Sequence, residues 1–124
     1  MIDKRQNVRY ESFAKAIVED ISEEEALLMD ISVTGCRIKT ANNIEIKPRK
    51  QYRITIIPEE AAKVELFFLD VETKWAGNEV DSFEFGFGIT RSPIGKQFEL
   101  YIDYLSWRYS QKNSMIGDGG SEIL

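Results

Sequence analysis

The sequence predicts a mainly β fold, an antiparallel barrel or sandwich followed by one C-terminal helix. Short segments in which apolar and polar residues alternate recur from residue 14 to residue 90. Turn-forming residues separate these segments. After residue 92 the apolar spacing changes from two residues to three or four, which is the spacing of a helix with one buried face. With 124 residues, 43% of them hydrophobic, the chain has the size of one domain.

Six strand-like segments are expected between an N-terminal arm and the helix. Residues 1–12 are polar and follow no apolar period, so they are assigned to an arm, and the domain proper begins at residue 13. The strands are expected at residues 14–21, 26–31, 35–40, 51–57, 63–75 and 82–90. Trp75 ends the fifth segment, and the sixth carries alternating apolar residues at Phe83, Phe85, Phe87 and Ile89. These side chains are expected to fill the barrel.

A helix is expected to close the domain. Ser92 is a favoured N-cap residue and Pro93 a favoured first helical residue, so the helix is placed over residues 93–112 and the domain ends there. Its apolar stripe consists of Phe98, Tyr101, Ile102 and Leu105. This stripe is expected to cover one end of the barrel, with a partner protein as the alternative. Residues 113–124 contain three glycines and are expected to form a disordered tail.

The residue inventory excludes several kinds of chemistry. The chain has no histidine and one cysteine, Cys36, which excludes an imidazole-based catalytic triad, an internal disulfide and a cysteine metal cluster. Cys36 is expected to be a small buried side chain. The acidic runs at residues 23–25 and 59–60 suit a solvated face better than acid–base catalysis, because adjacent strand residues point to opposite faces. No enzymatic activity, metal or cofactor is expected.

The charge balance limits which anions the chain can bind. The net charge is -5 and the pI about 4.8, which disfavours extended nucleic acid, including a single strand stacked on aromatic side chains. A small anion needs only a local arginine cluster, since the arginine fork pairs with phosphate whatever the distant charge. No apolar run is long enough for membrane insertion and no signal-peptide core is present, so the cytoplasm is the expected location.

Two short motifs carry a functional prediction. The first is an Arg-x-x-x-Arg formed by Arg5 and Arg9 in the arm. The second is an Asp-x-Ser-x-x-Gly formed by Asp30, Ser32 and Gly35 at a strand-to-strand turn. Each motif is common alone. Their order and spacing inside a β-rich domain of this length, with a C-terminal helix after it, together resemble the PilZ family of cyclic di-GMP receptors.

The resemblance implies a six-stranded antiparallel barrel with a flexible N-terminal arm. It also implies that Arg5, Arg9, Asp30, Ser32 and Gly35 contact cyclic di-GMP, because the matching positions do so in the family. The chemistry agrees, since arginine matches the O6 and N7 acceptors of guanine and a carboxylate accepts from the guanine N–H donors. Ser32 offers a hydroxyl to a phosphate or a base. Gly35 is expected to give the turn a backbone conformation that other residues avoid.

Three further residues are weaker candidates for the same ligand site. Lys4 precedes the first arginine, at a position that the resemblance associates with a second, stacked ligand. Gly86 and Gly88 lie on the polar face of the last strand, where the family often has a glycine near the ligand. A second Arg-x-x-x-Arg, at residues 49–53, is expected to be a solvated face.

The expected function is a receptor whose arm closes over cyclic di-GMP and presents a new surface to an unidentified downstream protein. The alternative is a PilZ-like adaptor that binds proteins without the nucleotide. Such adaptors typically lack the arginines or the turn motif, and this sequence has both.

Overall fold

The computed structural model describes residues 8–122, with side chains described over residues 8–112. Seven strands, a short 3-10 helix and one α-helix make up this part of the chain. They are β1 (Tyr10–Glu11), β2 (Lys15–Val18), β3 (Ala26–Ile31), β4 (Gly35–Thr40), β5 (Gln51–Ile57), η2 (Glu60–Ala62), β6 (Phe67–Asn78), β7 (Phe83–Ile89) and α1 (Gln97–Glu122). The fold is mainly β, as the sequence predicts.

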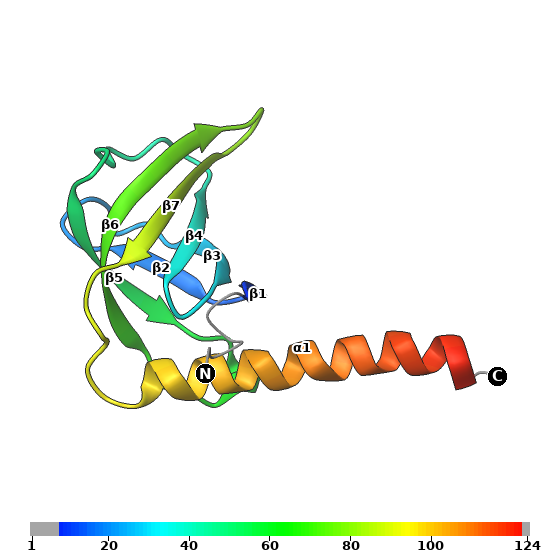
Figure 1. Cartoon of the computed structure of the whole chain (residues 1–124). Helices are drawn as coiled ribbons and strands as arrows, with labels where there is room; N and C mark the ends of the chain where they lie inside the picture. Colours follow the sequence, from blue (N-terminus) through cyan, green and yellow to red (C-terminus); the bar gives the residue numbers. More distant parts are fainter. Residues whose placement is uncertain (1–7, 123–124) are drawn as a thin grey trace.

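Six of the strands close into an antiparallel barrel (Figure 1). Neighbouring strands follow the order β3, β2, β5, β6, β7, β4, and β4 pairs again with β3 to complete the ring. The short β1 is an additional strand. It lies on the same edge of β3 as β2, because residues 30–31 of β3 pair with β1 and residues 26–27 pair with β2. Closure removes most of the exposed strand edges through which β proteins aggregate.

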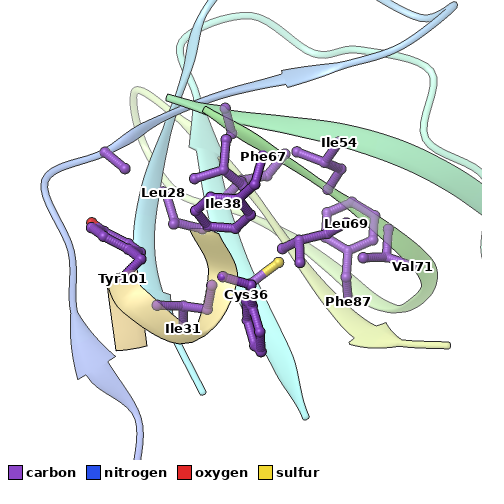
Figure 2. Close-up of a cluster of buried hydrophobic side chains, with 14 of the residues drawn as sticks. Leu28, Ile31, Cys36, Ile38, Ile54, Phe67, Leu69, Val71, Phe87 and Tyr101 are labelled. Atoms are coloured by element: carbon purple, nitrogen blue, oxygen red, sulfur yellow. The ribbon is translucent and has the colours of Figure 1, made fainter. Parts of the chain in front are cut away.

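Alternation along the strands fills the barrel with apolar side chains (Figure 2). In β5 the inward residues Tyr52, Ile54 and Ile56 are buried, while the residues between them are more exposed. Other members of the core are Leu28, Ile31, Ile38, Phe67, Leu69, Val71 and Phe87. Cys36 belongs to the same cluster, as predicted, and its burial raises the pKa of its thiol to about 12.

The helix α1 crosses one end of the barrel and continues beyond it (Figure 1). The apolar residues predicted from their spacing are all buried, namely Phe98, Tyr101, Ile102 and Leu105. Phe67 of β6 packs against the rings of Phe98 and Tyr101, with centroid separations of 5.9 and 5.8 Å. The stripe therefore covers the barrel, and the alternative of a partner protein on this face is wrong.

A polar network joins α1 to the end of the barrel that it covers. The Tyr101 hydroxyl donates to Glu59 Oε1 at 2.6 Å and shares a 2.7 Å hydrogen bond with Ser12 Oγ. Arg108 donates to Glu59 Oε2 at 2.9 Å and also to the backbone carbonyl of Glu11. Burial and the hydrogen bond to Glu59 raise the pKa of the Tyr101 phenol above its ordinary value. The helix is thus tied to the segment that follows β1 and to the segment that follows β5.

The helix differs from its predicted bounds at both ends. It begins at Gln97 rather than Pro93, because Gly95 has a φ of 87°, which no α-helix can contain. It ends at Glu122 rather than at residue 112. The glycines in the last turns each lower helix propensity by about 1 kcal/mol but do not block a helix, and no proline follows Pro93. Residues 113–122, which were expected to belong to a tail, thus continue the helix, and residues 123–124 lie outside the described residues.

The N-terminal arm is shorter than the sequence suggests. Tyr10–Glu11 form β1, whereas the arm was expected to extend to residue 12. The reason is tertiary, since the Tyr10 ring is buried and meets the edge of the Tyr109 ring on α1 at 5.6 Å. A two-residue strand has too few positions to show an alternating pattern.

The strand β6 begins and ends later than expected. It covers Phe67–Asn78 instead of residues 63–75, and the turn to β7 lies at residues 79–82. There the Glu79 amide donates to the Ser82 carbonyl at 2.8 Å. Because of this extension, β6 continues past Lys74 and Trp75, which line the candidate site.

Candidate functional site

The turn between β3 and β4 is held together by the Ser32 side chain. Ser32 Oγ accepts from the backbone amides of Thr34 and Gly35, both at 3.2 Å, and the Ser32 amide donates to the Gly35 carbonyl at 2.8 Å. The residue is buried. Its hydroxyl therefore supports a self-bonded turn with Asp30 before it and Gly35 at its end.

Asp30 lies between two arginines on the outer face of the barrel. Its Oδ1 accepts from Arg9 Nε at 3.0 Å and lies 2.8 Å from the same guanidinium's NH2. Its Oδ2 lies 2.9 Å from NH2 of Arg37, and Arg37 reaches Glu84 Oε1 through NH1 at 3.3 Å. The Asp30 carboxylate thus orients two guanidinium groups, that of Arg9 just before β1 and that of Arg37 on β4.

Two register shifts bring the site residues into one row across the strands. One lies in β3 just before Asp30, and the other lies in β6 just before Trp75. Beyond these shifts Asp30 is opposite Arg37, Arg37 is opposite Gly86, and Gly86 is opposite Trp75. An extra residue in one strand re-aims the side chains that follow it. The row therefore runs from β3 through β4 and β7 to β6.

Trp75 faces outward, and the prediction that it fills the barrel is wrong. The inward residues of β6 alternate up to Thr73, and the register shift then adds Lys74 to the strand. This extra residue breaks the alternation, so Trp75 falls on the outer face and is 47% exposed. Phe85 and Phe87 are buried in the barrel, as predicted.

Three glycines form the floor of the site because other atoms occupy the space of a side chain. A Cβ on Gly86 would overlap the indole of Trp75, and one on Gly88 would come within 2.7 Å of Lys74 Cε. A Cβ on Gly35 would lie 2.5 Å from the Phe87 carbonyl oxygen. Gly35 has no positive φ, so the expected reason for this glycine, a special backbone conformation, is replaced by the close approach of β7.

These elements line a groove of about 590 Å³, called here the outer groove. It gathers five of the predicted residues, namely Arg9, Asp30, Gly35, Gly86 and Gly88. Its other lining residues are Thr34, Cys36, Arg37, Lys74, Trp75 and Phe87. Three cations and one carboxylate line it, so it carries local positive charge on a chain of net charge -5. Such a groove suits a small anion with flat rings.

Arg37 and Lys74 line the groove although neither belongs to the two predicted motifs, and Trp75 lies outside the barrel that it was predicted to fill. Arg37 follows the turn motif by two residues, so the outward face of β4 was a usable signal. Lys74 and Trp75 enter through the register shift in β6, for which the sequence has no local signal. Arg5 and Lys4 lie outside the described residues.

The second Arg-x-x-x-Arg is a separate feature. Arg53 is bound to Asp70 through hydrogen bonds of 2.9 and 3.2 Å, and this contact lowers the pKa of the Asp70 carboxyl. Both residues are partly exposed and neither lines the outer groove. Arg53 therefore belongs to a surface ion pair, which agrees with the prediction that residues 49–53 form a solvated face.

The described residues contain no group of three or more cysteine, aspartate and glutamate side chains placed to hold a metal ion. None of the helices in this part of the chain is both long enough and apolar enough to span a membrane.

Comparison with known proteins supports the fold. No protein-family model matches the sequence, and no curated protein matches it. Among solved structures, the chain is similar to the structure of the Bacillus subtilis Inhibitor of motility (MotI/DgrA), with a TM-score of 0.69 and 21% sequence identity. The match covers 90% of this chain and 53% of that one, so this chain spans about half the length of that protein. At this identity the likeness establishes the fold.

Proposed function

We propose that this protein is a cyclic di-GMP receptor of the PilZ type, that the outer groove binds the nucleotide, and that the bound form acts on a partner protein. The observation that carries the proposal is the position of Asp30, whose carboxylate orients Arg9 and Arg37 in a groove floored by glycines. This arrangement offers guanine and phosphate their preferred partners within one cavity.

Arg9 and Asp30 are suited to read a guanine base. The Arg9 guanidinium is half exposed, and its fork matches guanine O6 and N7. Asp30 accepts from the guanine N1–H and N2–H donors, which arginine cannot do. In this proposal the base takes over part of the hydrogen bonding that Arg9 and Asp30 now give each other.

The remaining cations are suited to the phosphates. Arg37 and Lys74 line the groove, and the Lys74 side chain lies over Gly88, where no Cβ displaces it. Arg5 adds a second arginine from the arm, and Lys4 is the candidate contact for a second nucleotide. Trp75 presents half of its indole beside this floor, where a base can stack.

The arm supplies the conformational response. Arg9 comes directly before β1, which pairs with β3 and reaches α1 through Tyr10 and Tyr109. A ligand that draws Arg9 from Asp30 acts on a segment connected to both barrel and helix. Hydrogen exchange over residues 4–11 is expected to slow when the nucleotide binds; equal exchange in both states would remove the arm from the mechanism.

Calorimetric titration with cyclic di-GMP tests the binding site. The parent is expected to bind at micromolar concentration or tighter, and Arg9→Ala is expected to weaken binding at least about a hundredfold, since it removes a charged bidentate contact. Arg53→Ala is the matched control, because it removes an arginine from the surface ion pair outside the groove. No heat from a folded parent would contradict the proposal.

The adaptor without nucleotide binding is the second candidate function. The specific observation in its favour is that Asp30 already satisfies Arg9 and Arg37 without a ligand, as a purely structural ion pair would. In that case Asp30→Ala lowers the free energy of unfolding but changes no nucleotide titration, since the parent shows none.

A further inference from the structure

We infer that a second groove, between β1 and α1, binds an acidic segment of a partner protein that carries one aromatic side chain. This β1–α1 groove has a volume of about 320 Å³. Its lining residues are Arg9, Tyr10, Glu11, Phe13, Leu105, Arg108, Tyr109 and Lys112. Of its lining residues, it shares Arg9 alone with the outer groove and includes none of the three glycines.

Two exposed aromatic rings form its walls. Phe13, just after β1, is 63% exposed, and Tyr109 on α1 is 47% exposed. Both are held in place, since the Arg108 guanidinium lies 4.7 Å from the Phe13 ring centroid and Tyr10 packs edge-on against Tyr109. Fixed aromatic rings lose little conformational freedom on binding, which is why such residues anchor protein interfaces.

The charge of the groove selects the kind of partner. Arg9, Arg108 and Lys112 line it with positive charge, and Glu11 is its one carboxylate. Arg9 and Arg108 are already paired with Asp30 and Glu59, whereas Lys112 is 68% exposed and lies 3.9 Å from Glu11, a loose contact. A partner carboxylate can bond to Lys112, and it is attracted to a positive site on a chain of net charge -5.

The same charges argue against other occupants. An anionic membrane or a nucleic acid presents a large negative surface, which the acidic remainder of this chain repels. The groove is also concave, with a volume of about 320 Å³, and it is walled by a strand segment on one side and a helix on the other. A short acidic peptide with one ring satisfies both the shape and the charge.

Fluorescence anisotropy with the full chain tests this inference. The probe is a dye-labelled peptide with one phenylalanine between two pairs of glutamates, and its matched control carries glutamines instead. The glutamate peptide is expected to bind at least about tenfold more tightly than the glutamine peptide, because each lost ion pair weakens a polar contact. Equal affinity, or no binding of the glutamate peptide, would overturn the inference.

Two lysine variants locate the binding surface. Lys112→Glu reverses a charge in the groove and is expected to lower the affinity for the glutamate peptide about tenfold. Lys96→Glu makes the same change at an exposed lysine outside the groove and is expected to leave the affinity within about twofold. If both variants lost the same affinity for the peptide, the effect would come from net charge alone, which would contradict binding in the β1–α1 groove.

Phe13→Ser tests the aromatic wall, and vesicles test the rival occupant. Because Phe13 is exposed, the variant is expected to stay folded by circular dichroism and still to bind the peptide about fivefold more weakly. Unchanged affinity would count against the ring as an anchor. Phosphatidylglycerol vesicles are expected not to bind the parent. Vesicle binding lost in Lys112→Glu, together with no peptide binding, would assign the groove to a membrane surface.

Discussion

The indole of Trp75 lies against the Cα of Gly86, in the space where any other residue would carry its Cβ. The two residues are paired across β6 and β7 on the outer face of the barrel. This contact fixes how far the Trp75 ring stands out from the glycines of the outer groove. It also makes the position of Trp75 sensitive to the smallest possible change at residue 86.

Gly86→Ala is expected to displace Trp75 and to weaken cyclic di-GMP binding about tenfold, the loss that follows when one base loses its stacking partner. The change is measured by nucleotide titration and by tryptophan fluorescence in a Trp107→Phe background, where Trp75 is the single tryptophan. Gly77→Ala is the control, because its Cβ would meet Trp75 only at an ordinary 3.9 Å. Unchanged emission and affinity in Gly86→Ala would separate Trp75 from the ligand.

Gly35→Ala is expected to destabilise the barrel itself by about 3 kcal/mol, since the new Cβ collides with a backbone oxygen of β7 that cannot turn away. Urea denaturation measures this difference. The matched Gly77→Ala variant should stay within about 0.5 kcal/mol of the parent. If the two variants were equally stable, β4 and β7 would not approach as closely at Gly35 as the structure has it.

Tyr101→Phe removes the hydroxyl that joins Ser12 to Glu59 beneath α1. The expected cost is about 1–3 kcal/mol, because Ser12 and Glu59 are largely buried and each loses a partner. Tyr109→Phe makes the same chemical change on an exposed ring and should cost almost nothing. A parent-like unfolding curve for Tyr101→Phe would mean that the network does not secure the helix.

Cys36 should make the fold sensitive to alkali. Its folded-state pKa of about 12 lies above the value of about 8.5 for an unfolded cysteine. A raised folded-state pKa gives a contribution to stability that is complete below the unfolded value and is lost as pH rises towards the folded value. The free energy of unfolding should therefore fall between about pH 8.5 and pH 12 more steeply for the parent than for Cys36→Ala. Parallel curves would contradict this, and so would rapid reaction of the folded protein with a thiol reagent at pH 8.

The strands and the helix that show a clear period were the parts that the sequence could predict. The alternation over residues 51–57 predicts β5 with its observed bounds, and the spacing from Phe98 to Leu105 predicts the face of α1 that covers the barrel. These features depend on local alternation, which each segment displays by itself.

Two errors have different causes. The positive φ of Gly95, a local backbone conformation, delays the helix. Packing against Tyr109, a distant contact, turns the end of the arm into β1. In the site, the motif residues Arg9, Asp30 and Gly35 line one groove, and their contact with cyclic di-GMP stays a prediction. Arg37 and Lys74 complete the outer groove through pairing with other strands, which a single sequence does not display.

The extra residue in β6 makes the outer groove depend on the length of a strand as well as on its composition. Deleting Lys74 would make Thr73 and Trp75 adjacent, and simple alternation would then keep Thr73 inward and Trp75 outward, opposite Gly86. The deletion would remove the side chain that lies over Gly88 and leave the face of Trp75 unchanged. Position-by-position comparison with a chain that lacks the extra residue would pair Trp75 with an inward residue. An alignment must therefore open a one-residue gap at Lys74 to match the residues of the groove.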